Sequence, residues 1–288
     1  MDTIRNPVEW TVDQLKSAAR AAGSVGHSIR GAEADPYSPR PAVRRIEVAD
    51  LRDVLTKGLD DFRTFRTDVA FICIIYPIVG IILAAFACRN DLVALLFPIG
   101  SGFALIGPIA AVGLYEMSRR REQGVVATWA DAFGLVRSPA FGAIVALGLV
   151  LLSIFFLWLL TAQTIYVFTL GPEPPSSATE FVREVFTTGA GWTLIVAGMG
   201  VGFGFALVVL TLSVVSFPML LDRDVGVGAA IRTSVRVVAE NPRPMAAWGL
   251  IVAAGLVLGS IPLFLGLVVV MPVLGHATWH LYRKVVVR

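Results

Sequence analysis

The sequence predicts an all-α integral membrane protein, with six transmembrane helices arranged as three hairpins and an amphipathic helix on the cytoplasmic side before each hairpin. Three observations support this fold class. Of the 288 residues, 56% are hydrophobic and 16% are charged, and the mean hydropathy is +0.75. Long stretches lack any Asp, Glu, Lys or Arg, and the charges gather between them. This composition excludes an ordinary soluble domain.

The six predicted spans come from five uncharged stretches, each near or above the ~20 residues that cross a bilayer. The last stretch, 244–281, would form a single helix about twice as long as the ~30 Å hydrocarbon core is thick. Gly259 and Pro262 lie near its middle, where glycine tolerates a turn and proline removes a backbone donor. We therefore divide this stretch, and the predicted spans are 69–88, 92–115, 140–170, 187–221, 245–260 and 263–282.

The distribution of basic residues predicts the orientation. With six crossings, both termini and the loops 116–138 and 222–244 lie on one side and carry 22 of the 24 Lys and Arg residues. Only Arg89 and Arg183 lie on the other side. Because cytoplasmic segments carry the excess of Lys and Arg, we expect both termini in the cytoplasm. The first 45 residues do not read as a signal peptide, so the first span is expected to direct insertion.

Two regions are expected along the chain. Residues 1–45 are predicted to be a mobile cytoplasmic tail, because the proline-rich stretch 31–41 is typical of an extended linker. Residues 46–288 are expected to form the transmembrane domain. Two cysteines and three histidines are too few for a disulfide-stapled module, a zinc finger or an iron–sulfur protein.

A similar amphipathic segment precedes the first, third and fifth spans, at 50–65, 125–136 and 227–238. We expect these helices in the headgroup region of the cytoplasmic leaflet, with ordinary cytoplasmic loops as the alternative. The expected apolar faces are Leu51, Val54, Leu55, Gly58, Leu59, Phe62 and Phe65 in the first segment and Val227, Ala230, Ile231, Val235 and Val238 in the third. The expected polar face of the first segment is Asp50, Arg52, Asp53, Lys57, Asp60 and Asp61.

Two further patterns concern packing. Alternate glycines at 198–204, and the pair Gly255 and Gly259, place small residues four apart, which lets helices approach closely. We expect packing inside the monomer, more than dimerisation, to use these faces. Ser177 and Glu180 resemble a capping box, which predicts a short surface helix on the outer side, with its apolar residues toward the membrane.

His276 and His280 are the sharpest chemical feature of the chain. Because they are four residues apart, they share one face of the last helix and can present two imidazoles to one metal. Glu116, at the end of the second span, is the candidate third ligand if those two helices pack together. The favoured alternative is that both histidines bind backbone, water or lipid phosphate near the cytoplasmic interface.

Polar residues near the spans give two more candidate sites. Glutamate and arginine at helical spacings of three and four predict an interfacial charge cluster that meets anionic headgroups. Gln163, with Thr164 beside it, is a candidate solute contact inside the membrane, although an amide there normally bonds across helices. The interfacial charge cluster consists of Glu116, Arg119, Arg120 and Arg121.

Two segments resemble a known family. The stretch GPIAAVGLYEMSRRRE at 107–122 and the stretch PVLGHATWHLYR at 272–283 are similar to a bacterial family of predicted integral membrane proteins, domain of unknown function 2189. The resemblance extends from about residue 46 to the end of the chain. It implies a multi-pass protein of the bacterial cytoplasmic (inner) membrane and supplies no substrate or reaction.

Three functions remain open at this point. We favour a non-catalytic accessory, assembly or scaffold protein of a membrane complex, whose partners are the lipid bilayer and another membrane protein. The second is a transporter or channel for a small neutral or apolar solute, with a cavity at Gln163. The third is a haem- or metal-binding membrane protein that uses His276 and His280. We expect no enzymatic activity, no cofactor and no nucleic-acid partner, because the sequence lacks a catalytic triad in register, a phosphate-binding loop and a basic aromatic surface.

Overall fold

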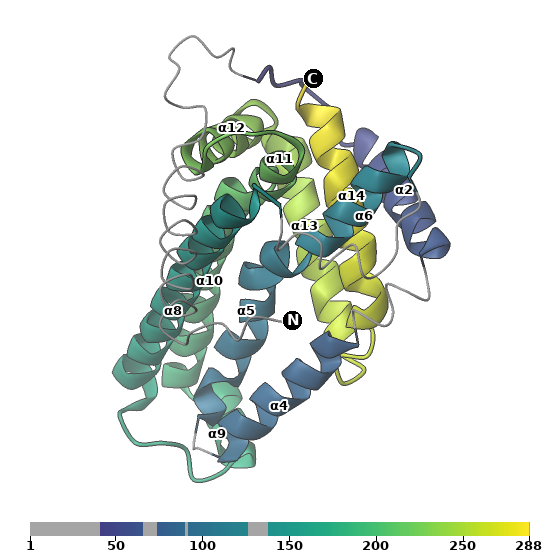
Figure 1. Cartoon of the computed structure of the whole chain (residues 1–288). Helices are drawn as coiled ribbons and strands as arrows, with labels where there is room; N and C mark the ends of the chain where they lie inside the picture. The colour runs from purple at the N-terminus through teal and green to yellow at the C-terminus, as the bar shows by residue number, and fades with distance from the viewer. Residues whose placement is uncertain (1–40, 66–73, 90–91, 126–137, 288) are drawn as a thin grey trace, which may run out of the picture.

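A computed structural model describes residues 41–65, 74–89, 92–125 and 138–287 of the chain (Figure 1). These residues are helical, apart from loops and one isolated bridge between Val43 and Val286. The expected all-α class is therefore confirmed for the described part of the chain. Its helices are α2 (Asp50–Thr64), α4 (Ile75–Arg89), η2 (Val93–Leu95), α5 (Leu96–Ala110), α6 (Val112–Glu122), α8 (Phe141–Leu170), α9 (Ala178–Thr187), α10 (Gly189–Ser213), α11 (Ser216–Asp222), α12 (Val227–Glu240), α13 (Pro242–Ser260) and α14 (Leu267–Val285).

Among the described residues, three helices are long and apolar enough to cross a membrane: α8, α10 continued by α11, and α13. A fourth crossing results if the segments Val93–Gly102 and Gly107–Glu122, which meet at a bend of 41°, count as one span. The predicted span 69–88 is described only from residue 74, where α4 is a shorter apolar helix. The predicted span 263–282 is occupied by α14, which is not among the candidates. Six crossings therefore remain a prediction.

The turn between α13 and α14 is longer than the sequence predicts. We expected a helix from residue 263, but α14 begins at Leu267. Leu263 and Phe264 have positive φ angles of 52° and 64°, a left-handed conformation that ends a helix. A Cβ built on Gly80 of α4 would lie 3.0 Å from the Phe264 ring, so the turn lies directly against α4.

The helices gather at the end of the molecule that holds α11, α12 and the C-terminus (Figure 1). There α6 packs against α14 and α11, and α12 packs against α10 and α11. The largest fully buried side chains lie in this region and include Trp248, Trp279, Tyr282 and Phe217. Toward the opposite end, α8 and α10 run side by side to α9 and expose many apolar side chains.

The helices expected at 50–65 and 227–238 are present as α2 and α12, and each buries one face. The segment expected at 125–136 lies almost wholly outside the described residues. The predicted faces differ from the observed ones at two positions. Asp61, expected on the polar face of α2, is 3% exposed, and Val235, expected on the apolar face of α12, is 41% exposed. In α12, Thr233 and Ser234 are buried instead.

The two ends of the described chain are joined. The Arg44 amide donates to the Val285 carbonyl at 2.8 Å, and the Val287 amide donates to the Ala42 carbonyl at 2.9 Å. The Asn241 side chain, after α12, accepts a hydrogen bond from the Ile46 amide at 2.8 Å. The last residues of the predicted tail, 42–45, are thus attached to the helical domain, and residues 1–40 lie outside the described part.

The short helix expected after Ser177 is α9. The Ser177 hydroxyl accepts a hydrogen bond from the Glu180 amide at 3.1 Å, as the capping pattern predicts. The Glu180 carboxylate binds Arg183. Of the apolar residues expected to face the membrane, Val182 and Phe186 are exposed, whereas Val185 is buried.

Candidate functional site

A buried polar cluster lies where α2, α6 and α14 meet. Two close helix contacts create it. A Cβ on Gly58 of α2 would lie 2.7 Å from the Ala277 Cβ, and a Cβ on Gly275 would lie 2.6 Å from the Leu114 side chain of α6. These contacts bring polar side chains of three helices together. We call them the Asp61 cluster: Asp61 of α2, Ser118 and Arg121 of α6, and His276 and His280 of α14.

Asp61 accepts hydrogen bonds from both other helices. Its Oδ2 lies 2.6 Å from the Ser118 Oγ and 2.9 Å from the His280 Nε2. Its Oδ1 pairs with the Arg121 guanidinium. The Ser118 Oγ lies in turn 2.7 Å from the His276 Nδ1. One carboxylate therefore links α2 to α6 and α14.

The charge of Asp61 fixes the proton positions in this cluster. Burial acts to raise the pKa of the Asp61 carboxyl, but hydrogen bonds from His280 and Ser118 outweigh burial and lower it below its usual value. The carboxylate is therefore ionised at neutral pH and can only accept. Ser118 must donate its single hydroxyl proton to Asp61, so His276 donates from Nδ1 to the Ser118 oxygen.

A serine, a histidine and an aspartate thus meet here, although the sequence shows no such triad in register. The hydrogen bonds run in the wrong sense for a serine hydrolase, in which the serine donates to histidine and the histidine donates to aspartate. Ser118 instead donates to Asp61 and is 1% exposed. This arrangement ties helices together and does not activate the hydroxyl.

A small polar pocket of about 320 Å³ opens beside the cluster. Its lining includes both positive and negative side chains, and Arg121 is already paired with Asp61. The pocket has no uniform charge that would select an anion or a cation. Its lining residues are Lys57, Asp60, Asp61, Ser118, Arg121, Glu122 and His280.

A second polar network continues from the cluster along α14. Asp222, at the end of α11, accepts hydrogen bonds from the Tyr282 hydroxyl at 2.7 Å and from Arg283 at 3.2 Å. Glu122, at the end of α6, accepts from Arg283 at 2.8 Å and from the Trp279 indole at 3.1 Å. This network fastens α6 and α11 to the last turns of α14.

The predicted metal ligands share one face of α14, and both belong to the Asp61 cluster. His276 is fully buried and His280 is partly buried, and each has a ring nitrogen bonded to a protein group. The helix that carries Glu116, α6, does pack against α14, as a third metal ligand would require. Both carboxylate oxygens of Glu116, however, are bound by arginines. The described residues hold no group of three or more His, Cys, Asp or Glu placed to share a metal. A metal at this pair stays a prediction.

The interfacial charge cluster divides in the structure. Glu116 pairs with Arg119 and Arg120, each at 2.8 Å, as the helical spacing predicts. Arg121 turns the other way and binds Asp61. Glu116 itself is 5% exposed, so the two ion pairs lie at the edge of the protein core.

The candidate solute contacts lie on an outer face of α8. Gln163 and Thr164 are both exposed, and the Thr164 hydroxyl donates to the Leu160 carbonyl of its own helix at 2.8 Å. Neither residue lines the polar pocket or the apolar groove described below. A solute contact at Gln163 stays a prediction.

Comparison with known proteins identifies part of the chain. Residues 96–222, which run from α5 to the end of α11, match the family model of a predicted integral membrane protein, DUF2189. Searches of curated proteins and of solved structures gave no match. Ser118 and Arg121 lie inside the matched segment, whereas Asp61 and the two histidines lie outside it. The similarity to this family of predicted integral membrane proteins therefore covers less than half of the chain.

Proposed function

We propose that this protein is a non-catalytic accessory or assembly subunit of a complex in the bacterial cytoplasmic membrane. It crosses the membrane six times with both termini in the cytoplasm, and it binds a helix of a partner membrane protein through α10. The observation that carries the proposal is an exposed, glycine-containing face of α10.

The exposed face of α10 contains Gly200 and Gly204. A Cβ at either position would meet nothing within 4 Å, so no described part of the chain packs there. Val196 and Val208, one turn away on either side, are 70% and 48% exposed. Glycines four apart let two helices approach closely within a bilayer, where van der Waals packing drives helix association. We call this row of four residues the α10 face.

Two other glycines of the spans are used for packing inside the molecule, unlike those of the α10 face. A Cβ on Gly202 would lie 3.0 Å from the Trp158 ring of α8, and one on Gly255 would lie 3.1 Å from Val270 of α14. Our expectation of packing within the monomer is therefore right for these glycines. Gly198, Gly200 and Gly204, which the same expectation covers, meet no described residue, whereas α8 packs against α10 at Gly202.

The pairing of the chain ends supports the proposed topology. Residues 42–44 bond to residues 285–287, so both ends of the described chain lie on one side of any membrane that it spans. The number of crossings is then even. Six crossings agree with this parity and place 22 of the 24 basic residues in the cytoplasm.

The experiment is a purification of the tagged full-length protein from its native membrane in mild detergent, with mass spectrometry of co-purifying proteins. The test variant, Gly200→Leu with Gly204→Leu, fills the α10 face. Ala206→Leu is the control, because it introduces a leucine at an exposed position outside the face. We expect a stoichiometric partner with the native protein and the control, and at least tenfold less of it with the double variant.

Two outcomes would contradict the proposal. Isolation of the protein alone, or only as copies of itself, removes the accessory role. Equal recovery of a partner with the double variant shows that α10 is not the binding surface. Solute flux into liposomes containing only the purified protein would favour the transporter hypothesis instead.

A further inference from the structure

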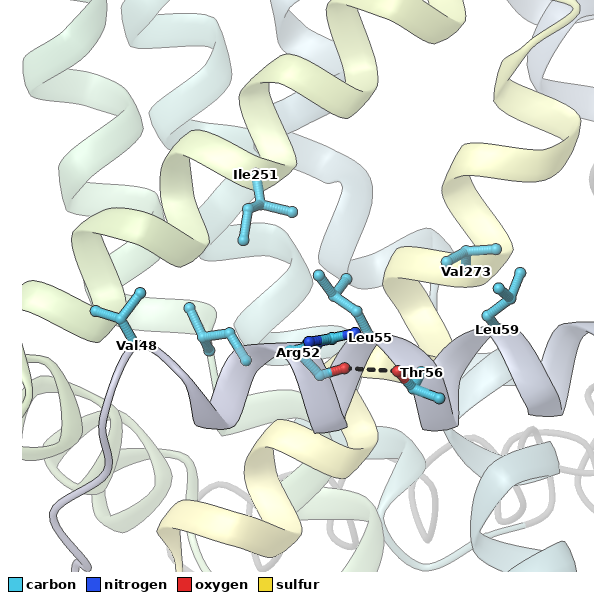
Figure 2. Close-up of a pocket in the computed structure, with 8 residues that line it drawn as sticks. Val48, Arg52, Leu55, Thr56, Leu59, Ile251 and Val273 are labelled. Atoms are coloured by element: carbon cyan, nitrogen blue, oxygen red, sulfur yellow. Dashed lines mark hydrogen bonds between the residues drawn. The ribbon is translucent and has the colours of Figure 1, made fainter.

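A second hollow, an apolar groove of about 440 Å³, lies between α2, α13 and α14 (Figure 2). Leu55 projects from α2 into the gap, with Ile251 of α13 on one side and Val273 of α14 on the other. At Gly58, which does not line the groove, α2 lies directly on α14. The lining residues are Val48, Leu51, Arg52, Leu55, Thr56, Leu59, Ile251 and Val273.

The walls of the groove are suited to a hydrocarbon chain. Six of the eight lining residues are aliphatic. The hydroxyl of Thr56 donates to the Arg52 carbonyl at 2.8 Å, so it is satisfied within α2 (Figure 2). A polar solute would find one side chain able to bind it, the guanidinium of Arg52, whereas an apolar chain would contact all the walls.

Arg52 differs from the other cations of α2. Lys57 pairs with Asp53 at 3.1 Å, and Arg63 pairs with Asp60 at 3.5 Å. Arg52 is exposed, and no carboxylate of the described residues pairs with it. The groove thus has an apolar interior and an unpaired guanidinium, which is a strong ligand for phosphate oxygens.

This combination matches an anionic phospholipid. The α2 helix lies at the charged end of the molecule, beside the polar network of α14, which is the level of the headgroups in the proposed orientation. We propose that the groove binds one acyl chain of an anionic phospholipid and that Arg52 binds its phosphate. This site is separate from the α10 face, so it stands or fails independently of the partner protein.

The experiment is native mass spectrometry of the delipidated full-length protein, titrated with phosphatidylglycerol or with phosphatidylcholine of the same acyl chains. We expect a first phosphatidylglycerol to bind more tightly than phosphatidylcholine. Arg52→Gln should weaken the first phosphatidylglycerol about fivefold, since one basic residue near a membrane contributes roughly 1 kcal/mol to anionic lipid binding. Its effect on phosphatidylcholine should be smaller.

Two further variants complete the test. Arg63→Gln is the matched control, because it removes the same charge from α2 at a residue that does not line the groove. It should leave the first binding step unchanged. Ile251→Trp fills the groove and should remove the first binding step for both lipids. Leu59→Phe narrows the other end of the groove and replaces Ile251→Trp in the test if that variant does not fold.

Three results would overturn the proposal. The first is a phosphatidylglycerol affinity that stays unchanged both in Arg52→Gln and, measured separately, in the groove-filling variants. The second is an equal loss with Arg63→Gln, which shows a general charge effect. The third is a first phosphatidylglycerol that binds the native protein no more tightly than phosphatidylcholine does.

Discussion

Asp61 occupies a position where the spacing of α2 calls for an apolar residue. Leu51, Val54 and Gly58 precede it at intervals of three and four, and all four residues are buried. A buried carboxylate needs partners, because an unpaired charge in the core is strongly destabilising. Asp61 finds them on α6 and α14, so one carboxylate links three helices.

The first prediction concerns removal of this charge. Asp61→Asn keeps the size of the side chain but deprives Arg121 and His280 of their carboxylate. We expect the free energy of unfolding at pH 7 to fall by about 2 kcal/mol, near the lower range for a broken buried pair because Arg121 is partly exposed. Asp60→Asn, the control, removes an exposed pair with Arg63 and should cost below ~1 kcal/mol. Denaturant unfolding in detergent measures both.

The loss in the free energy of unfolding caused by Asp61→Asn should depend on pH. The pKa of the Asp61 carboxyl is lower in the folded protein than in the unfolded chain, so its contribution is fully present above the unfolded value of ~3.9. The contribution is lost as pH falls through the lowered folded value. The stability of the native protein should therefore approach that of Asp61→Asn in acid. A difference that stays constant from pH 7 to pH 3 would contradict this account.

The sequence could have shown that Asp61 is buried, but not what it binds. Its spacing from Leu51, Val54 and Gly58 is visible in the sequence, and the charge alone led to its assignment to the polar face. The shared face of His276 and His280 follows from their spacing, and the structure bears it out. Their partners are separated by 158 residues for Ser118 and His276 and by 219 for Asp61 and His280. No local pattern reports contacts over such distances.

At the scale of elements, hydrophobic periodicity predicted where helices lie in the sequence better than it predicted which of their faces is buried. The helix α12 covers the expected segment, but its buried face is shifted so that Thr233 and Ser234 point inward. The second predicted span, 92–115, continues as a helix to Glu122. The sequence suggests an end at the first charged residues. Those charges are instead satisfied by ion pairs within α6 and with neighbouring helices, so the helix need not end at the membrane boundary.

The second prediction tests the crossing of α2 and α14. In Gly58→Ala, the new methyl group would lie 2.7 Å from the Ala277 backbone nitrogen and 2.8 Å from the Val273 carbonyl oxygen. Backbone atoms cannot move aside as a flexible side chain does, so the clash should outweigh the ~1 kcal/mol by which alanine favours a helix. We expect a net loss of about 1–3 kcal/mol in the free energy of unfolding.

Gly200→Ala is the matched control for Gly58→Ala. It introduces the same methyl group into a helix where nothing lies within 4 Å. In the purified protein it should leave stability unchanged or raise it by up to ~1 kcal/mol. Equal effects of the two substitutions would show that α2 does not lie as close to α14 as described.

At the scale of the whole molecule, the sequence predicts the all-α class and the family, and it leaves the number of crossings to experiment. The doubtful case is α14. Its second half carries His276, His280, Arg283 and Lys284, which lower its hydropathy. In the structure the first two lie in the Asp61 cluster and the last two are paired with carboxylates. A helix whose polar groups are covered by α2 and α6 can enter the membrane without presenting them to lipid.

The last prediction decides between six crossings and fewer. Single cysteines are placed at exposed positions in a variant with Cys73 and Cys88 replaced by serine, and intact cells are treated with a maleimide that does not cross the membrane. With six crossings, Ser176→Cys before α9 and Leu265→Cys between α13 and α14 should react from outside. Ala239→Cys on α12 should react only after lysis, because α12 is cytoplasmic in this topology.

The reactivity of Leu265→Cys is the decisive result. Residues 42–44 bond to residues 285–287, and Asn241, directly before α13, bonds to Ile46 and Arg44. The two helices α13 and α14 together must therefore return the chain to the side on which α13 begins. The two helices do this either by each crossing the membrane once or by not crossing it at all. Labelling from outside requires two crossings and makes α14 a span. If Leu265→Cys and Ala239→Cys both react only after lysis, α13 and α14 stay on the cytoplasmic side, and the three-hairpin topology is wrong.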